Sequence, residues 1–180
     1  SFNAKDRSPL LDLPVIYLNK KPLEGVRAAD DEGELSFNAN IQLGEKMRNG
    51  TNVVGFINNN APTTVIVGAH FDHLGYGEDG NSRYEKKEPA IHNGADDNAS
   101  GTASLIELAR ILKKTKTSTN NYLFIAFSGE ELGLYGSKYF TDHPTVDLKD
   151  VNYMINMDMV GRLNDSTKTI TIGGYGTSPT

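Results

Sequence analysis

Histidine and acidic residues gather in four short segments of the chain, and three of the four directly follow an apolar run typical of a buried β-strand. The segments are 68–73 (Gly-Ala-His-Phe-Asp-His), 94–101 (Gly-Ala-Asp-Asp-Asn-Ala-Ser-Gly), 128–131 (Ser-Gly-Glu-Glu) and 156–158 (Asn-Met-Asp). Open α/β sheets keep their chemistry at the carboxyl ends of such strands. Imidazole and carboxylate groups brought together there can hold divalent metals. The order of the segments therefore predicts a hydrolytic site built around a pair of metal ions.

His70 ends the first of these strands, and Asp72 follows two residues later. Because residues i and i+2 of an extended chain point the same way, the Asp72 carboxylate can lie behind the His70 imidazole. A carboxylate in that place fixes the tautomer of a metal-binding histidine. The alternative is a hydrogen-bonded histidine with no metal. His73 is a third candidate, but the same alternation turns it to the other side, where we expect it to be solvated.

Asp96, Asp97 and Asn98 stand just before a helix that the apolar spacing predicts over 99–114. Such residues commonly do no more than cap a helix N-terminus. In the alternative, one of the two carboxylates bridges two cations, and the helix N-terminus stabilises the anionic cluster. The sequence alone leaves both readings open.

Glu130 and Glu131 follow a second buried strand, and Asp158 ends a third between two methionines. Adjacent carboxylates at a buried strand end repel each other unless a cation lies between them. Successive side chains diverge, so one glutamate can bind a metal while its neighbour acts as a general base on a water. An exposed acidic turn and a helix cap are the alternatives for the pair and for Asp158.

The apolar periods predict an α/β fold with a mixed, mostly parallel, doubly wound sheet and helices on both of its faces. Strand, helix, strand, helix, strand is the order of its central part. The expected strands are 13–18, 37–43, 53–57, 64–69, 121–127, 153–157 and 169–172, with a hairpin signal at 49–50, and the expected helices are 99–114 and 134–140. Residues 30–34 (Asp-Asp-Glu-Gly-Glu) are expected in a solvated acidic turn.

The composition of the chain limits the kinds of partner and metal site that it can have. The 180 residues suit one α/β domain, and the net charge of −5 argues against nucleic acid or an anionic membrane surface. The chain has no cysteine, so a metal must be held by oxygen and imidazole ligands. No apolar run reaches the roughly 18 residues of a membrane span. No signal peptide opens the chain, and the expected location is secreted, periplasmic or in the cell envelope.

Over residues 65–162 the four motifs together resemble the co-catalytic di-zinc exopeptidases of the aminopeptidase S and aminopeptidase Y type. The resemblance implies a zinc-exopeptidase fold of the phosphorylase/hydrolase-like kind and two zinc ions. It also implies a role for each matching residue. Asp97 bridges the two ions and is joined to Asn98 by a cis peptide bond, Glu131 is a ligand of one ion, and His70 and Asp158 complete the ligands of the other ion. Glu130 is the general base, and Asp72 lies behind His70.

The resemblance further implies that the chain is truncated. Residues 1–35 resemble the tail of a protease-associated insert, and residues 36–180 the N-terminal part of the catalytic domain. The family carries a last histidine ligand well downstream of Asp158, and no histidine follows Asp158 here. We therefore expect one ion to keep only Asp97 and Glu131, so that this chain binds at most one metal tightly and has little or no peptidase activity. An unpaired sheet edge would then favour oligomerisation.

The function implied is that of a zinc aminopeptidase that removes the N-terminal residue of a peptide substrate. One alternative is a glutaminyl cyclase, which shares the fold; the 98–101 segment favours the peptidase. The other is a non-catalytic binding or receptor ectodomain, against which the intact candidate ligands and Glu130 argue. Hydrolysis of an aminoacyl substrate, blocked by chelation, distinguishes the three.

Overall fold

The structure is a computed structural model that describes residues 20–31, 47–85, 88, 90–115 and 119–174. The chain forms two compact units, Ser1–Met47 and Arg48–Thr180. In the first, α1 covers Lys20–Asp31. The acidic turn expected over residues 30–34 is therefore wrong at Asp30 and Asp31, which end a helix. Pro22 is compatible with that helix because it lies in the first turn, where backbone N–H groups need no partner.

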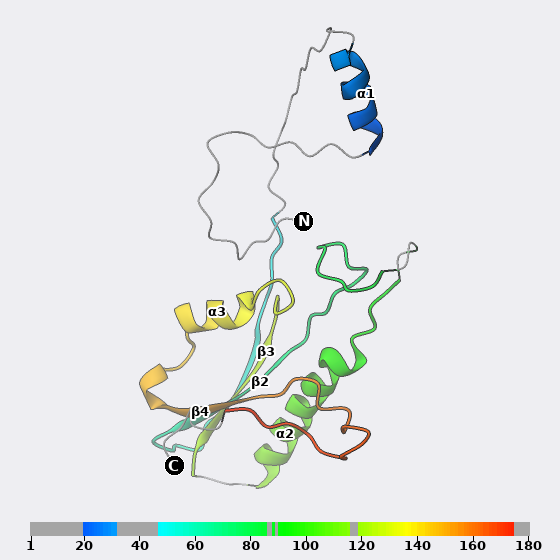
Figure 1. The fold of residues 1–180 in the computed structure, drawn as a ribbon. Coiled ribbons are helices and arrows are strands. Elements are labelled where there is room, and N and C mark those ends of the chain that lie inside the picture. Colours follow the sequence, from blue (N-terminus) through cyan, green and yellow to red (C-terminus); the bar gives the residue numbers. More distant parts are fainter. Residues whose placement is uncertain (1–19, 32–46, 86–87, 89, 116–118, 175–180) are drawn as a thin grey trace. The chain divides into compact units, whose positions relative to one another are not determined.

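The second unit is built on a four-stranded mixed sheet in the order β1-β3-β2-β4 (Figure 1). Its strands are β1 (Val53–Ile57), β2 (Thr64–His70), β3 (Asn121–Phe127) and β4 (Val151–Asn156). β2 runs parallel to both of its neighbours, and β1 runs antiparallel to β3. All seven residues of β2 are buried, as its β-branched sequence predicts for a strand covered on both faces.

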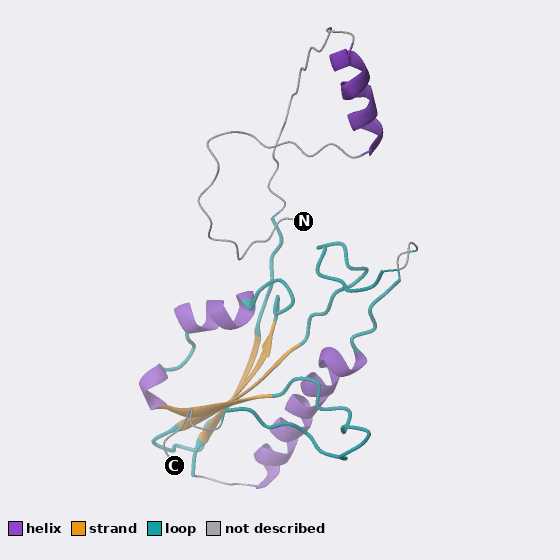
Figure 2. Cartoon of the chain, in the orientation of Figure 1, coloured by secondary structure: helices purple, strands orange, loops and turns teal. Residues whose placement is uncertain are grey.

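Helices cover both faces of this sheet (Figure 2). On one face Leu105 of α2 (Gly101–Thr115) packs in a cluster with alternate residues of β2 and with Phe124. On the other face Phe140 of α3 (Tyr135–Asp142) packs against Ile66 and the remaining buried residues of β3. Because successive side chains of a strand point to opposite faces, β2 and β3 contribute to both clusters. The expected fold class is confirmed.

The last expected strand is wrong. Residues 169–172 form no strand, and Ile170 and Ile172 are exposed. Alternating apolar residues make a strand only where a partner supplies hydrogen bonds, and β4, an edge strand of the described sheet, pairs only with β2. Tyr153, Met154 and Ile155 of β4 are also exposed, so the expected oligomerisation through a sheet edge stays a prediction.

Several other expectations fall outside the described residues. These are the strands at 13–18 and 37–43 and most of the proposed insert tail, so the division of the chain at residue 35 stays a prediction. No helix in the described part of the chain is long and apolar enough to cross a membrane.

Candidate metal centre

His70 lies at the carboxyl end of β2 and is the most enclosed of the candidate residues, with 4% of its surface exposed. Its Nδ1 lies 3.1 Å from the backbone carbonyl oxygen of Asp72. The Asp72 carboxylate is farther away, with Oδ1 at 3.7 Å from Nδ1. A proton on Nδ1 is thus directed to the carbonyl, which leaves the Nε2 lone pair facing the site. The expected tautomer control is present, but the Asp72 carbonyl provides it in place of the carboxylate.

Asp97 and Asn98 precede α2 in a kinked turn, and the peptide bond between them is cis, as the family resemblance implied. Both roles considered for this segment, a helix cap and a carboxylate that faces the metal site, are present, but on different residues. Asn98 is the cap, because its Oδ1 accepts a hydrogen bond from the amide of Gly101 at 3.0 Å. The Asp97 carboxylate is left to face His70, with Oδ1 at 3.3 Å from Nε2.

Asp96, the neighbouring carboxylate, belongs to neither of the residue groups that could hold a metal. Its oxygens accept hydrogen bonds from the Gly161 amide at 2.9 Å and from Arg162 Nε at 3.0 Å. The Arg162 guanidinium, followed by the Gly161 amide and the Ser100 hydroxyl, holds the pKa of Asp96 below its ordinary value. Asp96 therefore ties the segment after β4 to the start of α2.

Asp72 organises the turn that follows β3. Its Oδ1 accepts the backbone N–H of Glu130 at 3.1 Å, and its Oδ2 accepts that of Glu131 at 3.2 Å. With their amides fixed by one carboxylate, the two glutamate side chains diverge, as expected. Glu130 Oε2 lies 3.9 Å from His70 Nε2, whereas Glu131 Oε1 lies 2.7 Å from His73 Nδ1.

Asp158 reaches the same place from the end of β4, with Oδ1 at 3.5 Å from His70 Nε2. Asn98 holds this segment in position. Its Nδ2 donates to the carbonyl of Met157 at 2.9 Å, and its Oδ1 also accepts the Met159 amide at 3.3 Å. One buried amide side chain therefore sets the segments of Asp97 and Asp158 against each other.

The six expected site residues thus meet at one end of the sheet, and the ligand atoms fall into two groups that share Asp97. His70, Asp97 and Asp158 form the first group. His73, Asp97 and Glu131 form the second, in which His73 Nδ1 lies 3.9 Å from Asp97 Oδ1. In each group the ligand atoms lie within 4.8 Å of one another.

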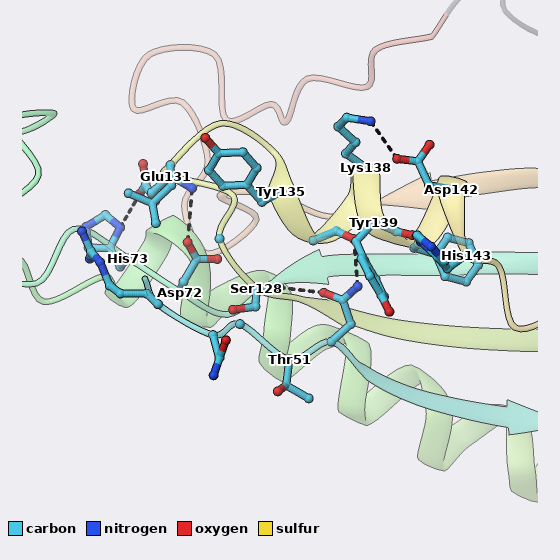
Figure 3. A pocket seen from close by; sticks show the side chains of 18 of the residues that line it. Thr51, Asp72, His73, Ser128, Glu131, Tyr135, Lys138, Tyr139, Asp142 and His143 are labelled. Atoms are coloured by element: carbon cyan, nitrogen blue, oxygen red, sulfur yellow. Dashed lines mark hydrogen bonds and ion pairs between the residues drawn. The ribbon is translucent and has the colours of Figure 1, made fainter. Parts of the chain in front are cut away.

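The expectation that His73 is solvated is therefore wrong. Its side chain is only 20% exposed, and Figure 3 shows its ring facing Glu131. Side-chain alternation does not extend to His73, because β2 ends at His70 and the next residues are irregular. The end of the apolar run was the signal that could have identified it. The expectation that one ion keeps only Asp97 and Glu131 stays a prediction.

The unpaired atoms of the site fit a pair of cations. Among the described residues, three buried side-chain atoms have no hydrogen-bond partner, namely His70 Nε2, His73 Nδ1 and Glu131 Oε1. One belongs to the first group and two to the second. A buried polar atom left unpaired costs about 1–3 kcal/mol. Metal ions bound by the two groups would contact all three atoms, although His73 Nδ1 and Glu131 Oε1 already form an ion pair with each other. Nitrogen and carboxylate oxygen are ordinary zinc ligands.

Glu130 has the environment of a general base. Burial raises the pKa of its carboxyl, and the carboxylates of Glu131, Asp158 and Asp72 raise it further, while His70 opposes the shift. A carboxylate with a raised pKa accepts a proton more readily near neutral pH.

The other two histidines lie outside both groups. His92 Nε2 pairs with the Ser82 hydroxyl at 2.8 Å, and His143 is exposed and stacks on Tyr139. A cavity of about 850 Å³ extends from the second ligand group to His143 (Figure 3). Its lining includes His73 and Glu131 at one end and Tyr139 at the other.

Replacing Asp72 by alanine should weaken zinc binding about 10–100-fold and destabilise the chain by about 1–3 kcal/mol. The reason is that two backbone N–H groups lose their acceptor and the turn of Glu130 and Glu131 loses its anchor. Zinc titration calorimetry and thermal unfolding measure the two effects. Asp165→Asn, at an exposed position, is the control and should change neither. Full zinc affinity in Asp72→Ala would mean that the turn holds its shape without Asp72.

Comparisons with known proteins agree with this geometry. Aminopeptidase YwaD of Bacillus subtilis is 39% identical over 101 residues, which are 56% of this chain and 19% of that protein. A probable leucine aminopeptidase of Arthroderma otae is 36% identical over 119 residues, 63% of this chain and 30% of that protein. The chain therefore spans less than a third of the length of either relative.

Two solved structures share the fold. A Zn-dependent exopeptidase from Parabacteroides distasonis superposes with a TM-score of 0.52 and 26% identity, over 61% of this chain and 41% of that one. A glutaminyl cyclase from Bacteroides thetaiotaomicron, bound to N-acetylhistamine, superposes with a TM-score of 0.52 and 25% identity over the same shares. The profile of peptidase family M28 matches residues 52–179, more than half of the sequence, and the chain belongs to that family.

Proposed function

We propose that the protein containing this chain is a zinc aminopeptidase that hydrolyses the N-terminal peptide bond of peptides. The observation that carries this proposal is the surroundings of His70 Nε2. This buried atom has no hydrogen-bond partner and is faced by carboxylate oxygens of Asp97, Asp158 and Glu130 at 3.3, 3.5 and 3.9 Å. Three anions converging on one imidazole nitrogen are stable together when a cation joins them.

In this proposal His70, Asp97 and Asp158 hold one zinc ion, and Asp97 with Glu131 holds a second. Zinc supplies polarisation of the scissile carbonyl and a lowered pKa of the attacking water. Glu130 removes a proton from that water and delivers it to the nitrogen of the leaving amine. Asp72 positions Glu130 and Glu131 through their backbone amides. The secreted, periplasmic or cell-envelope location is part of the proposal and is tested by fractionation of the source cells.

The second candidate function is glutaminyl cyclisation, which the likeness to the cyclase structures favours. Cyclisation also needs a proton acceptor beside a polarised carbonyl, so the geometry around Glu130 suits both reactions. The curated relatives named above are aminopeptidases, and they favour hydrolysis. A binding or receptor role would give no reason for the candidate ligands and Glu130 to be intact and gathered in one place.

The natural protein should hydrolyse an aminoacyl p-nitroanilide, beginning with the leucyl substrate, and 1,10-phenanthroline should abolish the activity until zinc is added back. The reason is that chelation leaves the carboxylates and imidazoles without the ion they bind. The 1,7-isomer, which does not chelate, is the control. Activity that survives chelation would exclude a metallopeptidase. Cyclisation of an N-terminal glutaminyl peptide without hydrolysis would assign the second function.

A further inference from the structure

One side chain, that of Asn52, holds both ends of the turn that carries Glu130 and Glu131. Asn52 lies directly before β1 and is half-buried. Its Oδ1 accepts a hydrogen bond from the backbone N–H of Ser128 at 3.1 Å, and its Nδ2 donates to the carbonyl of Gly136 at 2.8 Å. We propose that Asn52 is a positioning residue of the metal centre, which sets the place of the two glutamates. The inference rests on the proposed function, since it concerns how the same centre is assembled.

The turn between these two hydrogen bonds is closed by bonds of its own. Ser128 is the first residue after β3, and Gly136 is the second residue of α3. Between them the carbonyl of Glu130 accepts the amides of Gly133 and Leu134, both at 2.9 Å. A segment closed in this way moves as one body. Its attachments at the two ends therefore decide where its side chains lie.

Asn52 and Asp72 hold this turn from opposite sides. β3 lies between β1 and β2, Asn52 precedes β1, and Asp72 follows β2. Asp72 binds the amides of Glu130 and Glu131, and Asn52 supplies the attachment on the β1 side. With contacts on the β2 side alone, the turn could tilt about Asp72. A displacement of about 1 Å at a reacting group costs on the order of 10²-fold in rate, so such a tilt would affect catalysis.

The chemistry of the position requires an amide. The N–H of Ser128 needs an acceptor and the carbonyl of Gly136 needs a donor, and the asparagine side chain provides both. The approach is also close. A Cβ at position 136 would clash with the Ser128 carbonyl oxygen and lie 2.5 Å from Asn52 Oδ1, so only glycine lets α3 begin this near to the end of β3.

Asn121 offers a matched control, because it is a half-buried asparagine that also joins two segments through its side chain. Its Oδ1 accepts the amides of Asn59 and Ala61 at 2.9 and 3.2 Å, and its Nδ2 donates to the Ala61 carbonyl at 2.9 Å. It begins β3, so the length of that strand, roughly 20 Å, separates it from Ser128. Asn52→Ala and Asn121→Ala should both lower the unfolding temperature, because each leaves peptide groups without their partners.

Only the first of these variants should change the metal centre of the natural protein. At saturating zinc and substrate, Asn52→Ala should lower kcat by about 10–100-fold, the range for loss of an outer-shell partner. KM should change less than kcat, because Glu130 acts on the water and does not bind the substrate. In calorimetric titration of the metal-free protein, the ion bound by Glu131 should weaken within the same range. Asn121→Ala should change neither kcat nor zinc affinity.

Asn52→Ser provides a second, milder variant, since its shorter side chain cannot reach both groups. It should change kcat and zinc affinity in the same direction, and it replaces Asn52→Ala if circular dichroism shows that the alanine variant is unfolded. Wild-type kcat and zinc affinity in a folded variant at position 52 would overturn the proposal. Equal losses of kcat in Asn52→Ala and Asn121→Ala would also overturn it, because the loss would then follow from stability alone.

The same measurements separate this proposal from the proposed function. If wild type binds zinc but hydrolyses no aminoacyl substrate, the aminopeptidase function is wrong, and the zinc affinities of the variants alone decide the role of Asn52. If wild type hydrolyses the substrate and the variants at position 52 match it, only the role of Asn52 is wrong. No zinc bound by wild type would overturn both.

Discussion

Replacing Glu130 by glutamine in the natural protein should lower kcat on an aminoacyl substrate by about 10²–10⁴-fold and leave the zinc content unchanged. Glutamine keeps the size of the side chain and removes its ability to accept a proton. Glu130 is not a member of either ligand group, so loss of its charge should not release an ion. Steady-state kinetics and metal analysis of the same preparation measure the two quantities.

The adjacent glutamate provides the opposite pattern. Glu131→Gln should lose one zinc ion, because Glu131 belongs to the second group, and activity should fall as a consequence. Glu107→Gln is the neutral control, since that exposed glutamate pairs with Arg110 on α2. Turnover that is unchanged in Glu130→Gln would show that another group carries the proton. Loss of zinc in the same variant would show that Glu130 is a ligand.

The convergence of the site could be predicted from the sequence because it follows from topology. His70, Glu130 and Asp158 each come at or just after the end of an apolar run, and parallel strands bring their carboxyl ends to one edge of a sheet. The pairing of β2 with both β3 and β4 is what that expectation required. The helix after Asp97 was equally visible, because its apolar spacing spans several turns.

What could not be predicted depends on irregular backbone. His73 was placed by strand alternation, but its segment has already left the strand, and only the structure shows its ring beside Glu131. For the same reason the sequence could not show that Asp72 uses its carbonyl on His70 and its carboxylate on two amides. Turns of this kind have no periodicity, so their side-chain directions follow from individual hydrogen bonds.

The strand predicted at 169–172 was wrong for a different reason. Their alternation of apolar and polar residues is local, whereas a strand is a property of two segments. β2 and β3 have neighbours in the described sheet, and their predictions are confirmed. A pattern in one segment therefore predicts a strand reliably only when a partner segment can also be identified.

Asp97→Asn should abolish tight zinc binding at both positions, a larger effect than the loss of any ligand that serves one group. Asp97 is the only residue that the two groups share. Its Oδ1 lies 3.3 Å from His70 Nε2 and 3.9 Å from His73 Nδ1. A neutral amide keeps the shape of the side chain but cannot balance two divalent charges. Asp158→Asn and Glu131→Gln should each lose a single ion, and zinc titration of the three variants measures the difference.

Thermal unfolding tests the role of Asp97 independently, and the direction of each change in unfolding temperature can be predicted. Without metal, the like charges of Asp97, Glu130, Glu131 and Asp158 repel, so Asp97→Asn should unfold at a higher temperature than wild type in the presence of a chelator. With zinc at 100 times its Kd, each occupied site adds about 2.7 kcal/mol to wild type and nothing to the variant. Asp96→Asn is the matched control for the stabilisation by zinc, because that carboxylate pairs with Arg162 and serves neither group. A variant at position 97 that keeps one ion would show that the Asp97 carboxylate serves a single metal, and one that keeps both would remove Asp97 from the centre.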